Sequence, residues 1–314
     1  MGLAIGIDIG GTKVAAGVVD DEGHVLARGR RRTPSSDPDH IVDVCVEIVR
    51  QLRTDYDAGP VGVGAAGYID ASRSTVLFSP NLAWRNTPLR EQISARLGGD
   101  VVVENDANVA AWGEFRFGAG EQQVDMVCIT VGTGIGCGLI LSGQLYRGHF
   151  GIAGEPGHMR AVPGGRLCGC GNYGCLEQYA SGSALVRAAR EVATERRDDA
   201  KRLLQLAGGD IEAIDGPSVT MAAQEGDPAA IDCFNEIGRW LGQGLADIAA
   251  MLDPGRFVIG GGVAEAGELL LKSARDSFNA QLTGRGYRPH ADIVAASLGS
   301  DAGLIGAADL ARGG

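Results

Sequence analysis

Residues 4–19 read AIGIDIGGTKVAAGVV: an apolar segment through Ile9, a turn at residues 10–13, and a second apolar segment from Val14. Glycine and threonine in a short turn between alternating apolar residues are typical of a β-hairpin. A second turn at residues 21–23 precedes a third expected strand at about residues 24–32. The chain is therefore expected to open with three antiparallel strands.

The same pattern occurs a second time. Residues 129–140 read ITVGTGIGCGLI, and Gly132 takes the place of Gly10, 122 residues further along the chain. Each copy is a strand, a Gly/Thr turn and a returning strand, and such internal repetition indicates a duplicated architecture. We therefore expect an α/β fold of two lobes, with a cleft between them that both turns face.

Between and after these copies, strands alternate with helices. The periodicity predicts helices at about residues 38–55, 88–97, 106–117, 183–196, 201–206, 218–225, 227–252, 267–281 and 302–312, and strands at about 61–67, 101–104, 256–259 and 292–296. A long loop is expected up to Trp84. Alternation of this kind favours largely parallel sheets. We expect an N-terminal lobe of residues 1–117, joined by the C-terminal helix at about 300–314, and a larger C-terminal lobe of residues 118–299.

Composition excludes two classes of partner. The chain has 314 residues and a net charge of −11, which disfavours binding to nucleic acid or to anionic membranes, since both need a basic surface. No apolar run approaches the length of about 18 residues needed to cross a bilayer, and no basic leader precedes the first strand. A cytoplasmic protein is expected.

One histidine and three cysteines are gathered within a short glycine-rich segment: His158, Cys168, Cys170 and Cys175. Three thiolates and one imidazole complete the tetrahedral shell of a structural zinc ion. The alternatives are a disulfide or ordinary buried thiols. An expected cytoplasmic compartment and an odd total of 7 cysteines disfavour a disulfide scheme. The other four cysteines are scattered in apolar surroundings and are expected in the core, so the cluster predicts zinc.

Three glycine turns follow apolar strands. Bare backbone N–H groups in such turns can approach phosphate oxygens, and nearby hydroxyl groups and a lysine would add donors and charge. Together the turns predict a nucleotide cradle made of Gly10, Gly11, Thr12, Lys13, Gly132, Thr133, Gly134, Gly260, Gly261 and Gly262. Asp8, beside the first turn, either orients Mg²⁺ through water or stabilises the turn with an Asx contact.

A polar cluster follows the strand at residues 101–104. Asp106 lies between Asn105 and Asn108, at the point where ligands collect in open α/β sheets. A lone aspartate there would be interpreted as a helix N-cap, but its polar neighbours favour a carboxylate that accepts the proton of an attacking hydroxyl. Further groups able to bind a polyhydroxylated ligand are Glu155, His158 and Glu177.

These segments together resemble one known family. Residues 8–12 (DIGGT), 104–108 (ENDAN), 155–158 (EPGH) and 168–177 (CGCGNYGCLE) are similar to the motifs of the ROK family of repressors and sugar kinases, and to its bacterial glucokinases above all. The resemblance spans the whole chain. It implies an actin-like, hexokinase/Hsp70-type fold and transfer of phosphate from ATP, with Mg²⁺, to the 6-hydroxyl of glucose.

The resemblance also implies residue roles. Asp106 would be the general base. The sugar would be bound by Gly67 (through its backbone), Asn105, Asp106, Glu155, His158 and Glu177, and His158 would use its second ring nitrogen for the sugar while the first binds zinc. Regulators of the family carry a DNA-binding segment before the first strand, whereas this sequence begins on that strand, so a repressor is not expected. A homodimer or homotetramer is expected.

Several alternatives stay open. The sugar could be fructose, mannose or an N-acylmannosamine, because selectivity among hydroxyl groups depends on small displacements that sequence does not give. The phosphoryl donor could include polyphosphate. A sugar sensor without catalysis would use the same pocket, but it would be expected to lack the aspartate or to carry a DNA-binding extension.

Overall fold

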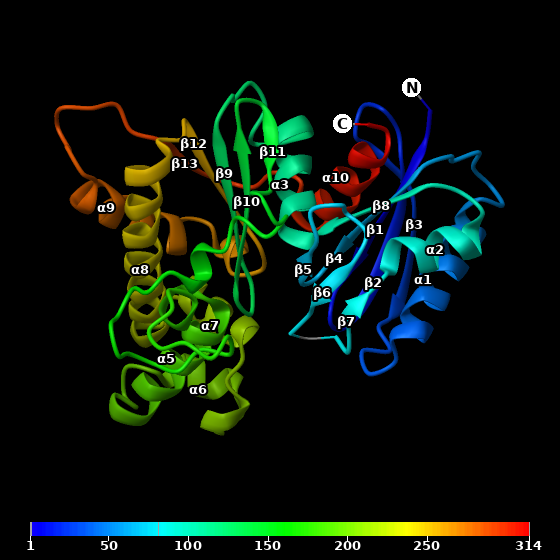
Figure 1. Ribbon diagram of the computed structural model, residues 1–314. Helices are drawn as coiled ribbons and strands as arrows, with labels where there is room; N and C mark the ends of the chain where they lie inside the picture. Colours follow the sequence, from blue (N-terminus) through cyan, green and yellow to red (C-terminus); the bar gives the residue numbers. More distant parts are fainter. Residues whose placement is uncertain (1, 81, 314) are drawn as a thin grey trace. The chain divides into compact units, whose positions relative to one another are not determined.

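The computed structural model describes residues 2–80 and 82–313 (Figure 1). Two compact units divide the chain. The first comprises residues 1–128, 138–154 and 296–314, and the second comprises residues 129–137 and 155–295. The second lobe expected from the sequence also includes residues 118–128, 138–154 and 296–299, which the compact units place with the first.

A five-stranded sheet forms the centre of the first unit. Its strands are β1 (Ala4–Ile9), β2 (Lys13–Val19), β3 (Val25–Arg32), β4 (Val61–Ala65) and β8 (Val101–Asn105), in the order β3-β2-β1-β4-β8. The first three strands are antiparallel neighbours, as the opening hairpins predict. The strands β1, β4 and β8 run parallel, so their carboxyl ends meet at one edge. Residues Ile9, Ala65 and Asn105 form the last row of this edge.

Helices cover both faces of this sheet. Alternate side chains of β1, such as Ile5 and Ile7, share a core with α1 (Pro38–Leu52) and α2 (Leu89–Leu97). The opposite face packs against α10 (Ala302–Ala311), which also contacts α3 (Asp106–Phe117). A Cβ at Gly6 would lie 1.8 Å from the carbonyl oxygen of Leu304, so glycine is what allows α10 to approach the strand. The helices that alternate with strands in the sequence thus form two layers, one on each face of the sheet.

The loop expected before Trp84 is partly a small sheet. The strands β5 (Tyr68–Ile69) and β6 (Val76–Phe78) lie within the expected loop, and β7 (Arg85–Thr87), which follows Trp84, completes the sheet; the three pair in sequence order. Strands of two or three residues are too short to show an alternating pattern, which explains why the sequence predicts a loop there. The expectation of a long loop up to Trp84 was therefore wrong where β5 and β6 lie.

The second five-stranded sheet repeats the plan of the first. Its strands are β9 (Met126–Val131), β10 (Ile135–Leu141), β11 (Gln144–Tyr146), β12 (Arg256–Gly260) and β13 (Asp292–Ala295), in the order β11-β10-β9-β12-β13. The strands β10 and β11 are antiparallel, and β12 and β13 are parallel. The repetition seen in the sequence is confirmed as a repetition of sheet topology.

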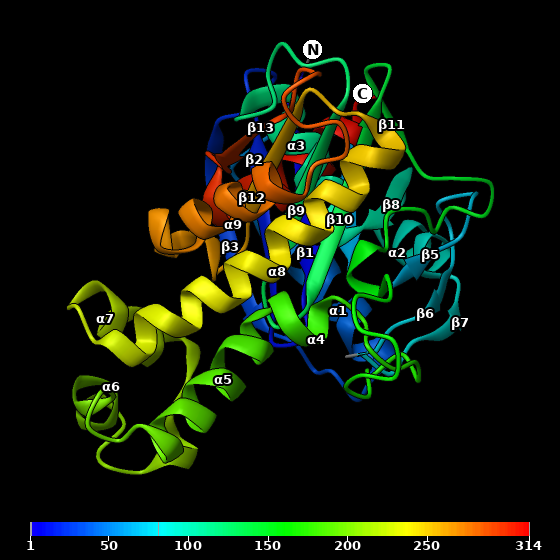
Figure 2. The ribbon, with the colours of Figure 1, turned by 90° about the vertical axis from the view of Figure 1, so that its left-hand side faces the viewer.

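Helices dominate the remainder of the second unit. They are α4 (Glu177–Ala180), α5 (Gly182–Glu195), α6 (Lys201–Leu206), α7 (Gly216–Gln224), α8 (Pro228–Leu252) and α9 (Glu268–Gln281). Short 3₁₀ turns lie at Pro156–His158, Ile211–Ala213 and Ala264–Ala266, and a further one precedes α10 at Gly299–Asp301. Figure 2 shows α8 alongside α9. In the part of the chain that the structure describes, no helix combines the length and apolarity needed to cross a membrane.

Candidate functional site

The junction between β8 and α3 carries the first group of site residues. Asn105 is the N-cap of α3: its side-chain oxygen accepts a hydrogen bond from the backbone N–H of Asn108 at 3.0 Å. Its side-chain amide donates to the carbonyl oxygen of Gly67 at 3.0 Å. The capping role considered for Asp106 therefore belongs to its neighbour, and the carboxylate of Asp106 is not needed as the cap.

Asp106 is the first residue of α3 and is half-buried. Burial raises the pKa of its carboxyl group, and hydrogen bonding to the N–H of Ala107, at 3.0 Å, partly offsets this effect. A carboxylate with a raised pKa is a stronger proton acceptor than an exposed one. The residue thus has the electrostatic property that a general base needs.

Asp8 lies in the same sheet, one residue before the last row of its edge. It pairs there with Gly64 of β4, and Gly64 pairs with Glu104 of β8. Burial and then the negative charge of Asp106 raise the pKa of Asp8 to about 6, against a lowering effect of Lys13. A Cβ at Gly303, in the first turn of α10, would lie 3.5 Å from the Asp8 carboxyl carbon. A buried acidic group beside a second one is a fitting place for a cation.

Gly67 has a backbone conformation that requires glycine. Its φ is +135°, and a Cβ there would lie 2.4 Å from the carbonyl oxygen of Phe78. The chain can therefore turn sharply after β4 and present the Gly67 carbonyl to Asn105. Gly67 and Asn105 are brought together as the resemblance implies.

The first glycine turn lies at the end of β1. The N–H of Gly10 donates to the carbonyl of Lys13 at 3.0 Å, which closes the turn. Thr33, which directly follows β3, connects that strand to the turn: its hydroxyl donates to the Gly10 carbonyl at 2.8 Å and its N–H donates to the Thr12 carbonyl at 3.1 Å. Gly10, Gly11, Thr12 and Lys13 therefore belong to the first unit, together with Asp8, Gly67, Asn105 and Asp106.

The histidine and the three cysteines converge in the second unit. Their ligand atoms all lie within 4.8 Å of one another. The sulfur atoms of Cys170 and Cys175 are 3.6 Å apart, and the sulfur of Cys168 is 3.7 Å from Nδ1 of His158. Ligands around a tetrahedral zinc ion with bonds of about 2.3 Å are separated by about 3.8 Å. The donor set and its spacing both fit zinc.

The two ring nitrogens of His158 face different groups. Nδ1 lies toward Cys168, whereas Nε2 lies 4.0 Å from a carboxylate oxygen of Glu155. Glu177 is close to the same cluster, with Oε1 at 3.9 Å from Nδ1 of His158 and 3.1 Å from the Cys168 sulfur. The residues expected to bind a sugar in the second unit, Glu155, His158 and Glu177, thus lie around the cysteine cluster.

A cavity of about 910 Å³ lies in the second unit beside the second glycine turn. Its lining includes Gly132, Thr133 and Gly262 from the expected cradle. The turns are joined to one another, since the N–H of Gly182 donates to the Gly132 carbonyl at 2.7 Å and the N–H of Val263 donates to the Val131 carbonyl at 3.0 Å. Gly134, Gly260 and Gly261 adjoin these turns but do not line the cavity.

Most of the lining was not foreseen from the sequence. It comes from α5 and α7 and from the segment after β12: Gly182, Ser183, Leu185, Val186, Gly216, Pro217, Thr220, Met221, Gln224, Val263 and Glu265. Small and apolar residues at the start of a helix are ordinary helix residues when considered alone. Only the folded chain shows that the two helices meet at the second glycine turn.

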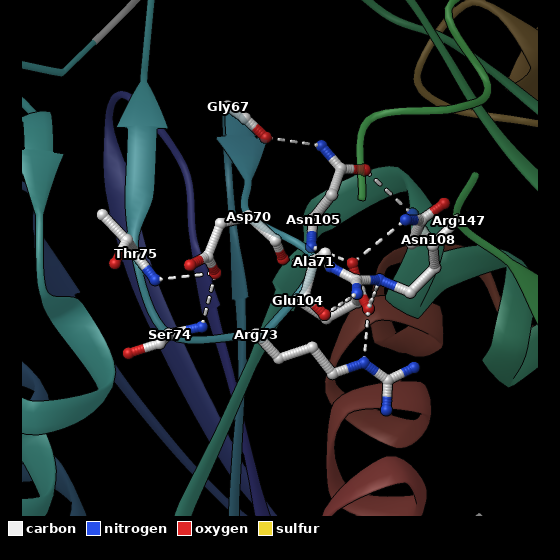
Figure 3. A network of polar contacts seen from close by, with 10 residues as sticks. All are labelled: Gly67, Asp70, Ala71, Arg73, Ser74, Thr75, Glu104, Asn105, Asn108 and Arg147. Carbon is white, nitrogen blue, oxygen red and sulfur yellow. Dashed lines mark hydrogen bonds and ion pairs between the residues drawn. The ribbon is translucent and has the colours of Figure 1, made fainter. Parts of the chain in front are cut away.

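Sequence reasoning also missed a charged network behind the Asn105–Asp106 turn (Figure 3). Glu104 is 0% exposed and is paired with Arg73 and Arg147, which come from two other segments of the first unit. A buried glutamate is a signal that could have been noticed, because a charge after three valines is unusual in a central strand.

Comparison with known proteins places this arrangement in context. A protein-family model described as the ROK family matches residues 4–313. The glucokinase of Streptomyces coelicolor is 52% identical over 312 residues, which cover 99% of this chain and 98% of that protein. The crystal structure of a ROK family glucokinase from Streptomyces griseus, in complex with glucose and AMPPNP, is 53% identical, with a TM-score of 0.93 and 100% coverage of both chains.

A more distant structure agrees. The ROK hexokinase of Thermus thermophilus is 33% identical, with a TM-score of 0.79, and the match covers 99% of this chain and 98% of that chain. Together with the two sheets of like topology, these similarities confirm the actin-like fold class expected from the sequence.

Proposed function

The chain belongs to the ROK family, and we propose that it is a glucokinase, which transfers the γ-phosphoryl group of ATP to the 6-hydroxyl of glucose. The observation that carries this proposal is the identity of more than half of the residues, over the full chain, with glucokinases. The half-buried carboxylate of Asp106 at the end of β8 supports it independently.

In this proposal Asp106 is the general base. The carboxylate accepts the proton of the 6-hydroxyl as the oxygen attacks the γ-phosphorus, and the bond from phosphorus to the bridging oxygen of ADP breaks. Phosphoryl transfer depends chiefly on positioning and on charge stabilisation, so the base contributes by orienting the hydroxyl and removing its proton. Asn105, whose side chain is held by Asn108 and Gly67, would orient a sugar hydroxyl in this proposal.

The remaining sugar contacts are assigned to Glu155, His158, Glu177 and the backbone of Gly67. The carboxylates can accept hydrogen bonds from hydroxyl groups, and Nε2 of His158 is the ring nitrogen directed away from the cysteines. Fixing these groups in advance lowers the cost of ordering the site when sugar binds.

The nucleotide is assigned to the glycine turns and the adjoining cavity. Backbone N–H groups and the hydroxyl groups of Thr12 and Thr133 would face phosphate oxygens, and Lys13 would add positive charge. The cavity in the second unit has the size of an ordinary small-molecule site. Mg²⁺, when bound, would neutralise phosphate charge, and Asp8 is the carboxylate that would orient it.

Zinc is proposed as a structural ion held by His158, Cys168, Cys170 and Cys175. When bound, the ion would fix the segment that carries His158 and Glu177. The reaction itself needs no chemistry from zinc. We further propose a cytoplasmic homodimer or homotetramer, a state that light scattering on the purified protein would test.

Glucose is favoured over other hexoses because the two glucokinases are 52% and 53% identical, whereas the hexokinase is 33% identical. The test is ADP release in Mg-ATP with glucose, mannose, fructose, N-acetylglucosamine and N-acetylmannosamine supplied in turn. High turnover with glucose and little with the others is expected. Equal turnover with several sugars would contradict a glucokinase, and binding of glucose without ADP release would indicate a sensor.

A further inference from the structure

We propose that Arg147 and Glu104 act as a positioning pair, a buried ion pair that holds the Asn105–Asp106 turn in the geometry that phosphoryl transfer requires. This inference rests on the proposed function, since it adds residues to the same site. Neither residue is among those assigned to the sugar, the nucleotide or a metal.

The carboxylate of Glu104 has four partners, shown in Figure 3. Oε1 accepts hydrogen bonds from the backbone N–H of Asn105 at 2.8 Å and from the side-chain amide of Asn108 at 3.0 Å. Oε2 lies 3.0 Å from Nε of Arg73 and 2.6 Å from Nε of Arg147. A fully buried carboxylate is costly without such partners, so the network determines how this carboxylate is oriented.

The position of Glu104 indicates that its charge supports the turn after β8 and not the sheet itself. The strand β8 is otherwise apolar until its end, and Glu104 pairs with Gly64 of β4, which has no side chain to pair with its charge. What Glu104 adds is an acceptor for the backbone of Asn105 and for the side chain of Asn108, the two residues joined by the helix cap. The carboxylate of Glu104, two residues before the proposed base, therefore holds the N-cap residue Asn105 in place.

Arg147 is the more constrained of the two arginines. Its guanidinium group donates to the carbonyl of Ala71 at 3.0 Å and to the carbonyl of Asp70 at 2.9 Å, in addition to the ion pair with Glu104. Its side chain is 11% exposed, against 31% for Arg73. A planar fork with three fixed partners has little freedom to move. Arg147 thus locks the carboxylate to the turn after β5.

That turn has hydrogen bonds of its own. The Asp70 side chain accepts hydrogen bonds from the N–H groups of Ser74 and Thr75, at 2.8 and 3.1 Å, and from the hydroxyl of Ser72 at 2.7 Å. The segment that follows Arg147 packs on the same place, because a Cβ at Gly151 would lie 2.7 Å from the carbonyl oxygen of Ile69. Arg147 therefore connects the end of β8 to a hydrogen-bonded and closely packed turn.

Removal of Arg147 would leave Glu104 with a single, more exposed cationic partner. The carboxylate could then rotate toward Arg73, and the Asn105 N–H and the Asn108 amide would lose their acceptor. A displacement of about 1 Å at a catalytic site can lower turnover by about a hundredfold. The glycine turns and the cavity assigned to the nucleotide share no residue with this network, so binding of ATP should be unaffected.

The test compares Arg147→Met with Arg312→Met. Arg312 is a matched control: its guanidinium donates to two backbone carbonyls, of Val19 at 3.0 Å and Asp20 at 2.8 Å, and pairs with Asp309 at 3.3 Å. Both variants lose a buried arginine of the first unit. We expect kcat with glucose to fall by about 10- to 100-fold in Arg147→Met, with an unchanged KM for ATP, while Arg312→Met keeps the wild-type kcat.

Equal kcat values for Arg147→Met and wild type, or an equal loss in Arg312→Met, would overturn the proposal. If Arg147→Met does not fold, Glu104→Gln replaces it: glutamine keeps the shape of the side chain but removes the charge that pairs with Arg147, so a fall in kcat is expected here too. If the wild-type protein does not phosphorylate glucose, the proposed function fails instead. Calorimetry then tests the pair, because Arg147→Met should weaken glucose binding and Arg312→Met should not.

Discussion

Glu177 lies against Gly134 so closely that a Cβ at position 134 would stand 2.7 Å from Oε2 of the glutamate. The second glycine turn therefore limits where this carboxylate can lie. Because Glu177 is proposed to bind sugar, Gly134→Ala should raise the KM for glucose by about tenfold or more. Steady-state kinetics at saturating ATP would measure it.

The control for this substitution is Gly59→Ala, since no atom lies within 4 Å of the added Cβ there. If Gly134→Ala folds normally and its KM for glucose is unchanged, the result would contradict the proposed role of Glu177 in sugar binding.

Metal analysis tests the cysteine cluster. Purified protein should contain zinc in a stoichiometric amount, and Cys168→Ser should lose both the metal and most of the activity, because the proposed ion fixes His158 and Glu177. The second group of possible ligands, Asp20, Glu22 and His24, gives a control: His24→Ala should keep its zinc. Active, chelator-free protein without zinc would contradict the proposal.

The buried carboxyl of Asp8 should make stability depend on pH. Its pKa is raised from 3.8 to about 6, so the folded protein holds this proton more tightly than the unfolded chain does. The contribution to stability is complete below pH 3.8 and is lost as the pH rises through about 6, a change of the order of 3 kcal/mol. Without Mg²⁺ or nucleotide, Asp8→Asn should therefore gain Tm relative to wild type as the pH rises from acidic to neutral.

An exposed carboxylate, Asp57, controls for the loss of one negative charge in the variant Asp57→Asn. Thermal unfolding of the three proteins across this pH range would measure the differences. If the difference in Tm between Asp8→Asn and wild type does not change with pH, the fold does not raise the pKa of Asp8.

Filling the cavity in the second unit with a larger side chain should weaken the binding of ATP. Val186 lines it from α5, and Val186→Trp should raise the KM for ATP while leaving the dissociation constant of glucose unchanged, because a larger side chain occupies the space proposed for the nucleotide. Met251→Trp, at a side chain that is 77% exposed, is the control. If the variant binds ATP normally, the nucleotide lies elsewhere.

The features that could be predicted from the sequence are those with a periodic pattern or a turn signal within a short segment. The opening hairpins, the second copy at residues 129–140 and the long helix α8 all show a period or a turn signal within a short window. The cysteine cluster was also predictable, because its ligands are close in the chain. Local pattern was sufficient for these features.

Other features depend on contacts between distant segments. The strands β5, β6 and β7 are too short to carry a period, so they were missed. The lining from α5 and α7 becomes a pocket only where those helices meet Gly132. Glu104 and Arg147 are 43 residues apart, and nothing in the local sequence of either indicates the other. Only the folded structure shows that these two residues form an ion pair.

The most direct test of the account is the turnover of Asp106→Asn with saturating Mg-ATP and glucose, together with its glucose affinity by calorimetry. Asparagine keeps the shape of the side chain but cannot accept the proton. The account predicts a loss of kcat of at least about a hundredfold, with glucose affinity and Tm close to those of wild type. Turnover near that of wild type would contradict the assignment of Asp106 as the base.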